Sequence, residues 1–203
     1  MFENLKKTIQ QISQMQVSEE RKEFLKPLVE FIQSKKEQNE TISLNFICTH
    51  NSRRSHLSQI WAQAMAEYFE VKNVFCYSGG TEVTALFPQV AETLQNQGFE
   101  VLKLSPGDNP VYAVKFAENA APIIGFSKTY DDAFNPASNF AAVMTCSNAD
   151  QGCPFIPGAE KRIAVKFEDP KISDGTPEMA ATYTQRSLDI AAEMYFVFQA
   201  CSC

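Results

Sequence analysis

Residues 42–61 read ISLNFICTHNSRRSHLSQIW, a segment in which a strand pattern, a polar loop and a helix pattern follow one another directly. Apolar residues alternate along 42–47 and predict a short strand. After the loop at 48–54, apolar residues recur from Leu57 onward at helical spacing and predict an amphipathic helix. A strand that leads through a compact loop into a helix is typical of α/β folds with parallel sheets.

Strand and helix patterns alternate along the rest of the chain, which predicts an α/β fold with a mainly parallel sheet. Thr176 and Pro177 suit the cap and the first turn of a final helix. Two strand-like segments of the middle region predict an extra hairpin. The predicted strands cover 73–77, 99–104, 140–145 and 163–167, the helices cover 88–97 and the stretch after 176, and the hairpin covers 111–117 and 122–130.

The first forty residues precede this alternation. The spacing of Leu5, Ile9 and Ile12 predicts one helix, and Ser18 followed by two acidic residues predicts the start of another. The polar residues 35–40 suit a linker. We therefore expect an N-terminal helical extension at 1–40 and a main domain at 41–203.

The composition narrows the classes of function. The 203 residues carry a formal net charge of −6, and no apolar run is long enough to cross a membrane. An acidic balance without a basic tract argues against nucleic acid as the main partner. No apolar secretion signal opens the sequence, so a cytoplasmic location is expected. In a reducing compartment, six cysteines indicate catalytic, redox or metal chemistry, although Cys76 lies in an apolar run and fits a buried side chain.

The loop from Cys48 to Ser55 has the residues of an oxyanion site. Between a strand and a helix, successive backbone N–H groups can surround a tetrahedral anion, helped by the helix N-terminus. Arg54 can bind two anion oxygens at once, and Ser55 can donate a hydrogen bond to the sulfur of Cys48. The same field favours the thiolate, the nucleophilic form of cysteine.

This loop resembles the signature loop of low-molecular-weight protein tyrosine phosphatases and of the thioredoxin-coupled arsenate reductases that share their fold. The resemblance implies a four-stranded parallel sheet with helices on both faces. It also implies Cys48 as the nucleophile, Arg54 as the anion-binding arginine, Asn51 as a brace of the loop and Ser55 as the support of the sulfur. The substrate-binding residues would be Thr49, His50, Asn51, Ser52, Arg53, Arg54 and Ser55.

The loop also departs from the family pattern. His50 stands where glycine is usual, and Arg53 stands where cysteine is frequent. Gln59 occupies a position that is glutamate in the reductases with a potassium site, which argues against a bound potassium ion. No metal ion and no bound cofactor are expected. We expect His50 at the rim of the site and His56 on the surface.

Asp169 is the candidate general acid. It precedes Pro170 after a predicted strand end, and an Asp-Pro pair in a late loop supplies the acid in the resembled family. A carboxylic acid can protonate a leaving group if its site raises the pKa toward neutrality. The alternative is that Asp169 only starts a turn.

A second thiol pair distinguishes the two activities of the family. Cys146 and Cys153 are separated by six residues and followed by Pro154, and the segment resembles the redox segment of the arsenate reductases. A phosphatase needs no thiol here, whereas a reductase must transfer two electrons to arsenate. The resemblance implies that Cys146 and Cys153 resolve the adduct on Cys48 in turn, and that an external thioredoxin-like dithiol reduces the final disulfide.

Three functions therefore remain open. The first is arsenate reduction by a thiolate relay. The second is hydrolysis of phosphomonoesters through a phosphocysteine at Cys48, with Tyr130 and neighbouring aromatic residues near the entrance. The third is a non-catalytic protein that binds an oxyanion or metalloid. A zinc site with Cys201 and Cys203 is disfavoured by its spacing, and these two cysteines are expected in a C-terminal tail.

Overall fold

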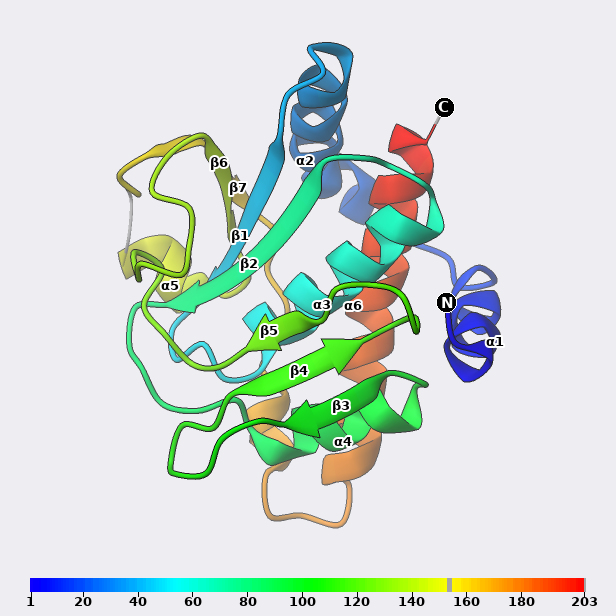
Figure 1. Cartoon of the computed structure of the whole chain (residues 1–203), viewed down its shortest axis with the longest axis vertical. Coiled ribbons are helices and arrows are strands. Elements are labelled where there is room, and N and C mark those ends of the chain that lie inside the picture. Colours follow the sequence, from blue (N-terminus) through cyan, green and yellow to red (C-terminus); the bar gives the residue numbers. More distant parts are fainter. Residues whose placement is uncertain (153–154, 203) are drawn as a thin grey trace.

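The computed structural model describes residues 1–152 and 155–202, and its centre is a four-stranded parallel sheet (Figure 1). The strand order is β2-β1-β6-β7, so the strand that precedes the oxyanion loop lies inside the sheet. The predicted four-stranded parallel sheet is confirmed. Its strands are β1 (Ile42–Cys48), β2 (Val74–Gly80), β6 (Phe140–Met144) and β7 (Ala159–Ala164).

The register of the sheet brings two loops together. Ile47 of β1 is paired with Met144 of β6, and the two strands run in the same direction. The segments that follow them therefore leave the sheet at the same edge, where ligands bind in parallel sheets. β7 begins at Ala159, earlier than the predicted strand at 163–167, because the polar first half of this edge strand gives no apolar signal.

Helices cover both faces of the sheet, as predicted. The face with Leu44 and Phe46 shares one core with the large helices, whereas the face with Ile47 and Met144 forms a smaller cluster with Ala149 of α5. Figure 1 shows α5 on the left of the sheet and α3 and α6 on its right. The helices of the two faces are α2 (Glu19–Glu37), α3 (Arg54–Tyr68) and α6 (Met179–Cys201) on one side and α5 (Ser147–Gly152) on the other.

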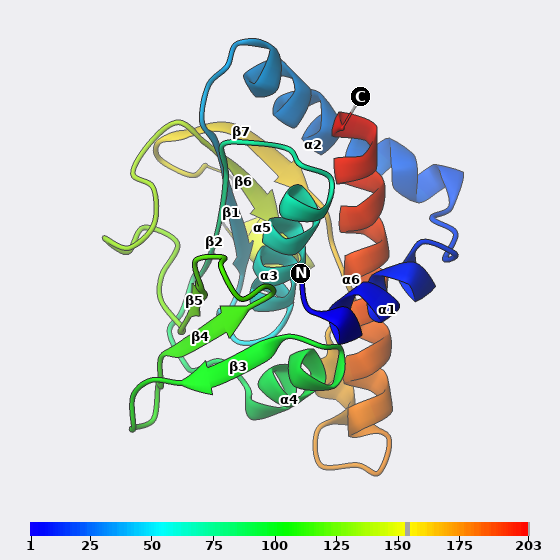
Figure 2. The same cartoon turned by 45° about the vertical axis from the view of Figure 1, so that its right-hand side comes forward.

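A second, three-stranded sheet lies below the first beside α4 (Figure 2). It contains the predicted hairpin, in which β4 and β5 are antiparallel. The strand predicted at 99–104 joins this hairpin rather than the parallel sheet, because its antiparallel partner is the next strand along the chain. The elements are α4 (Pro88–Asn96), β3 (Glu100–Lys103), β4 (Tyr112–Lys115) and β5 (Ile123–Gly125).

Two helices, α1 (Glu3–Ile12) and α2, form the N-terminal forty residues. Leu5, Ile9 and Ile12 are buried in the same core as the main sheet. Gly98 adopts a φ of +100°, and a Cβ on it would lie 2.3 Å from the backbone nitrogen of Leu5, so α1 docks directly on the turn after α4. Figure 2 shows α1 beside α6.

The C-terminal residues do not form the expected tail as far as Cys201. Cys201 is the last residue of α6 and is buried, with its sulfur 3.8 Å from the carbonyl oxygen of Val29 on α2. Burial raises the pKa of the Cys201 thiol to about 12. The expectation of a tail was wrong for Cys201, because apolar residues of α6 continue to the helix end and bury it. Cys203 lies outside the described residues. Cys76 is buried, as expected.

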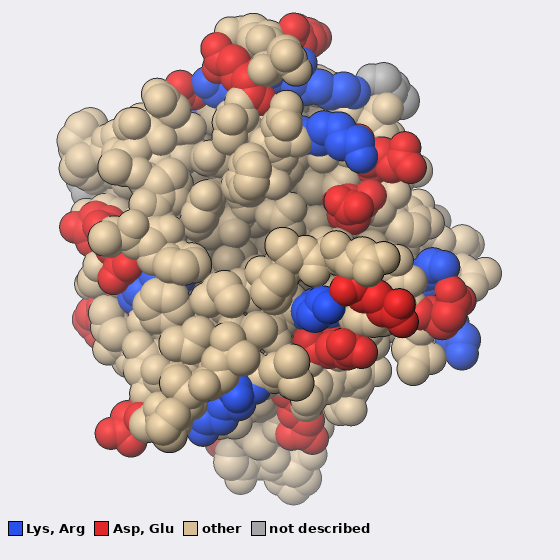
Figure 3. Space-filling model, in the orientation of Figure 1, with Lys and Arg blue, Asp and Glu red and all other residues tan. Residues whose placement is uncertain are grey.

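The surface mixes charges of both signs. On the face drawn in Figure 3, lysine and arginine are interspersed with aspartate and glutamate. None of the helices within the described residues is both long and apolar enough to span a bilayer.

Candidate active site

The loop between β1 and α3 turns its carbonyl groups outward. The carbonyl of Thr49 accepts from the N–H of Glu82 at 2.8 Å, and the carbonyl of Ser52 accepts from the N–H of Phe87 at 3.0 Å. Within the described residues, no acceptor receives a hydrogen bond from the backbone N–H groups of 49–53. These N–H groups are therefore available as a ring of donors of the kind that binds anions at such loops.

Asn51 braces the ring from inside. Its φ of 44° lies in the left-handed region, which asparagine tolerates better than most residues. The buried side-chain amide donates to Ser55 Oγ at 2.9 Å, and its oxygen accepts from the N–H of Lys128 at 3.0 Å. Gly80 lets β2 approach, because a Cβ there would lie 2.8 Å from the Asn51 nitrogen and 2.7 Å from the Thr49 oxygen.

Cys48 is at the end of β1 and at the bottom of the loop. Its sulfur lies 3.1 Å from Ser55 Oγ. Since Ser55 Oγ already accepts from Asn51, its single hydrogen is available for the sulfur. Ser55 can therefore donate a hydrogen bond to the sulfur of Cys48.

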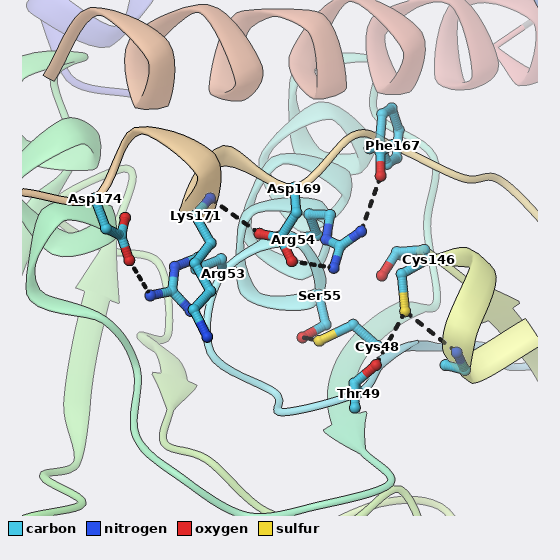
Figure 4. Close-up of polar contacts among 12 residues, drawn as sticks. Cys48, Thr49, Arg53, Arg54, Ser55, Cys146, Phe167, Asp169, Lys171 and Asp174 are labelled. Atoms are coloured by element: carbon cyan, nitrogen blue, oxygen red, sulfur yellow. Dashed lines mark hydrogen bonds and ion pairs between the residues drawn. The ribbon is translucent and has the colours of Figure 1, made fainter. Parts of the chain in front are cut away.

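Arg54 links the loop to the candidate acid (Figure 4). Its guanidinium donates to the carbonyl of Phe167 at 3.0 Å and to the carboxylate of Asp169 at 2.5 Å. Asp169 also caps the short 3-10 helix η1 (Pro170–Ser173) by accepting from Lys171 N at 3.1 Å. Asp169 thus starts a turn and also pairs with an arginine of the oxyanion loop, and its role as general acid stays a prediction. A small pocket is lined by Cys48, His50, Ser52, Arg53, Arg54 and Asp169.

Cys146 is next to the same loop. It follows β6, and its buried sulfur lies 3.5 Å from Thr49 Oγ1 and accepts from the N–H of Ala149 at 3.4 Å. The second thiol of the predicted pair, Cys153, lies outside the described residues. In the part of the chain that is described, no group of three or more histidine, cysteine or acidic residues is arranged to hold a metal ion.

Several curated proteins have sequences similar to this chain, and two of them illustrate the similarity. An arsenate reductase of Bacillus subtilis is 28% identical over 145 residues, which is 71% of this chain and 85% of the relative. An arsenate reductase of Staphylococcus aureus is 27% identical over 129 residues, which is 63% of this chain and 78% of the relative. The chain is similar in sequence to these bacterial arsenate reductases. No protein-family model matches it.

The fold of this chain is shared with a phosphatase. A low-molecular-weight phosphotyrosine phosphatase of Vibrio cholerae superimposes with a TM-score of 0.52 at 14% identity, over 77% of this chain and 93% of that one. The chain therefore has the low-molecular-weight phosphatase fold. The resemblance inferred from the oxyanion loop is confirmed at the level of the fold, and the chain is similar in sequence to arsenate reductases.

Arg53 makes contacts that the sequence did not predict. Its guanidinium donates to Tyr183 Oη at 2.5 Å and to the carboxylate of Asp174 at 2.6 Å, and it lies 4.1 Å from the centroid of the Phe87 ring. Burial alone lowers the pKa of Arg53, but its partners Tyr183 and Asp174 outweigh burial and raise that pKa. These partners are 121 and 130 residues away, so no local pattern could reveal them.

The two histidines have different environments. His50 lies at the rim, as expected, with Nε2 3.3 Å from Glu82. The expectation of a surface position for His56 was wrong: it is fully buried on α3, with Nδ1 3.2 Å from Ser78 Oγ. Burial, followed by the charge of Lys128, lowers the pKa of His56 to about 3, so the ring is neutral. The error has a simple cause, since α3 is buried on nearly all sides.

Lys128 is a further residue that the sequence did not single out. Its side chain is buried against the rings of Phe126 and Phe134, and burial lowers the pKa of its ammonium to about 8. Its backbone connects to the loop at Asn51 and to β2 at Gly80. Gln59, at the position of the potassium-site glutamate, donates its amide to the carbonyl of Cys76 at 3.1 Å.

Proposed function

We propose that this protein reduces arsenate to arsenite with a relay of three thiols. The observation that carries the proposal is the position of Cys146, whose sulfur is in contact with Thr49, the residue next to Cys48. Hydrolysis of a phosphomonoester uses one thiol and gives no reason for a second one at this place. Reduction of arsenate requires two electrons, which a pair of thiols supplies when it becomes a disulfide.

The relay begins at Cys48. Its thiolate attacks arsenic and displaces one oxygen, which leaves as water after protonation. Cys146 then attacks the sulfur of Cys48, the electron pair of the sulfur–arsenic bond passes to arsenic, and arsenite leaves. Cys153 attacks the sulfur of Cys146 and releases Cys48 as thiolate. An external dithiol of the thioredoxin class, the expected partner, reduces the Cys146–Cys153 disulfide.

The loop and the acid support the first step. The N–H ring and Arg54 hold the oxygens of the anion, and Ser55 stabilises the attacking sulfur. Asp169 is proposed to protonate the departing oxygen. Arg54 is paired with Asp169 in the free protein, so an arriving oxyanion competes with this carboxylate for the guanidinium.

Phosphatase activity is the second candidate. The pairing of Arg54 with Asp169 beside Cys48 would serve a phosphomonoester equally well. A phosphotyrosine substrate would gain from an aromatic wall, and the pocket lining contains none within the described residues; Tyr130 packs with a cluster that includes Ile47 and Phe140. This lining favours a small inorganic anion.

The deciding experiment is thioredoxin-coupled consumption of NADPH on addition of arsenate, for the wild type and Cys146→Ser. Turnover that disappears in the variant supports the relay. Turnover that persists moves the resolving role to another thiol. Rapid aryl-phosphate hydrolysis without arsenate turnover in the wild type makes the protein a phosphatase, and anion binding without either reaction makes it a binding protein.

A further inference from the structure

Arg53 is a second guanidinium in the pocket beside Arg54. It lines the same small pocket as Cys48, and the side chain is 13% exposed. The proposed reaction gives it no role beyond its place in the loop. A buried arginine beside a nucleophilic thiol nevertheless adds both positive charge and directed donors to the site.

The orientation of this guanidinium is fixed on three sides. Asp174 and Tyr183 accept from Nη2 and Nε, and the ring of Phe87 lies over its plane. Tyr183 also donates to the other oxygen of Asp174 at 2.6 Å, so the acceptors are themselves held. Figure 4 shows Arg53 between Asp174 and Cys48. Within the described residues Nη1 has no hydrogen-bond partner, which leaves a preoriented donor for a ligand.

We propose that Arg53 is a specificity-determining residue that binds the fourth oxygen of an inorganic tetrahedral oxyanion. Its Nη1 thereby selects arsenate and phosphate over aryl phosphomonoesters. The inference rests on the proposed function, in which the substrate is such an anion. The proposal is supported by the position of the Arg53 guanidinium. Asp174, Tyr183 and Phe87 hold it on the wall of the pocket that contains Cys48.

The number of oxygens explains the selectivity. The N–H ring and Arg54 can bind three oxygens of either kind of anion. The fourth substituent is an oxygen with negative charge or a hydroxyl in an inorganic anion, but a bulky ester group in an aryl phosphate. A fixed donor at that position gains a charge-assisted hydrogen bond with the inorganic anion. With the ester it meets only an uncharged bridging oxygen, which is a weaker acceptor and carries the aryl group.

A purely structural role predicts something different. The ion pair of Arg53 with Asp174 also ties the oxyanion loop to the segment that carries Asp169. If this tie were the only function, removal of either partner would disturb the site equally. If Arg53 binds the anion, only the removal of Arg53 weakens binding. Without Asp174, the guanidinium is still oriented by Tyr183 and Phe87, and a negative charge that competes with the anion is gone.

The test measures binding without turnover, by isothermal titration calorimetry in a Cys48→Ser background, with inorganic phosphate and phenyl phosphate as probes. Arg53→Met is expected to raise the phosphate dissociation constant about tenfold or more, and to change that of phenyl phosphate less than about threefold. Asp174→Asn is expected to leave phosphate binding unchanged or tighter. Arg21→Met is the matched control, because Arg21 is also paired with a carboxylate, Glu193, and lies over the ring of Phe167.

Equal weakening of both probes in Arg53→Met, unchanged phosphate binding in it, or equal weakening by Asp174→Asn overturns the proposal. If Arg53→Met does not fold, Arg53→Lys serves instead: it keeps the charge but lacks the fork, and an unchanged preference for phosphate in it overturns the proposal as well. The result is separable from the proposed function, since a wild type that prefers phosphate but shows no arsenate turnover would contradict the relay and not the role of Arg53.

Discussion

The hydroxyl of Thr49 lies 3.5 Å from the sulfur of Cys146, although 97 residues separate them in the chain. Thr49 follows Cys48 directly, so this contact joins the oxyanion loop to the segment that begins the second thiol pair. The contact exists because β1 and β6 are adjacent and parallel and end at the same edge of the sheet. Several consequences of this arrangement can be measured.

Thr49→Val should slow the step in which Cys146 attacks. The hydroxyl can donate to the sulfur of Cys146 and hold it beside the loop. Such a hydrogen bond contributes about 0.5–1.5 kcal/mol, or roughly a three- to tenfold change in rate. Arsenate-dependent NADPH consumption measures the loss. Thr84→Val is the control, since Thr84 donates to the carbonyl of His50 outside the pocket. If Thr49→Val consumed NADPH as fast as this control, Thr49 would have no role in the relay.

Asp169→Asn should separate chemistry from binding. If Asp169 is the general acid, hydrolysis of p-nitrophenyl phosphate and reduction of arsenate should both fall about 100-fold or more. Phosphate binding should stay equal or become tighter, because Arg54 loses a competing carboxylate. Glu168→Gln is the neighbouring control, with a carboxylate that is 91% exposed and paired with Arg186. Weaker phosphate binding in Asp169→Asn would contradict this assignment.

Asp150 should anchor α5 in a pH-dependent way. Burial tends to raise its pKa, but hydrogen bonds from Lys166 and Arg162 outweigh burial and hold that pKa below its ordinary value of 3.8. A carboxylate whose pKa is lower in the folded state than in the unfolded state stabilises the folded state at pH values above the pKa of the unfolded state. This contribution disappears as the pH falls through the pKa of the folded state. We expect amide hydrogen exchange in 147–152 to increase as the pH falls below 3.8, after correction for intrinsic exchange rates.

The variant Asp150→Asn isolates this effect. It should exchange quickly in α5 already at neutral pH and should lose most of the acid dependence. Asp189→Asn is the control, because Asp189 is paired with Arg186 on α6, on the other side of the sheet. If α5 in Asp150→Asn kept the pH dependence of the wild type, another group would have to anchor the helix.

Gly80→Ala should disturb the oxyanion loop directly. The added methyl group would lie 2.6 Å from the Glu82 oxygen and 2.7 Å from the Thr49 oxygen, both backbone atoms that cannot rotate away. Overpacking of this kind costs about 1–3 kcal/mol, to be measured by urea unfolding together with phosphate binding. Gly152→Ala is the matched control, since no atom of the described residues lies within 4 Å of its added methyl group. Equal stability of the two variants would mean that the loop adapts.

Local sequence patterns were sufficient to predict most of the helices and strands and the oxyanion loop, which is one half of the site. The alternation in 42–47, the polar loop and the helical spacing after Leu57 predict β1, the loop and α3, because strands and helices have distinct apolar periods. Cys48, Asn51 and Ser55 lie so close in the sequence that a single loop brings their side chains together. The parallel sheet and the extra hairpin also followed from local patterns.

Tertiary structure alone decided the other half. The burial of His56, the docking of α1 on Gly98 and the end of α6 at Cys201 depend on which surfaces face each other, and a single helix pattern does not contain that information. The partners of Arg53 are likewise remote in the chain and show no recurring spacing. The sequence by itself determined which groups can perform the chemistry. The packing of the sheet edge decided which of them meet, because contacts between distant residues are set by the assembly of whole elements.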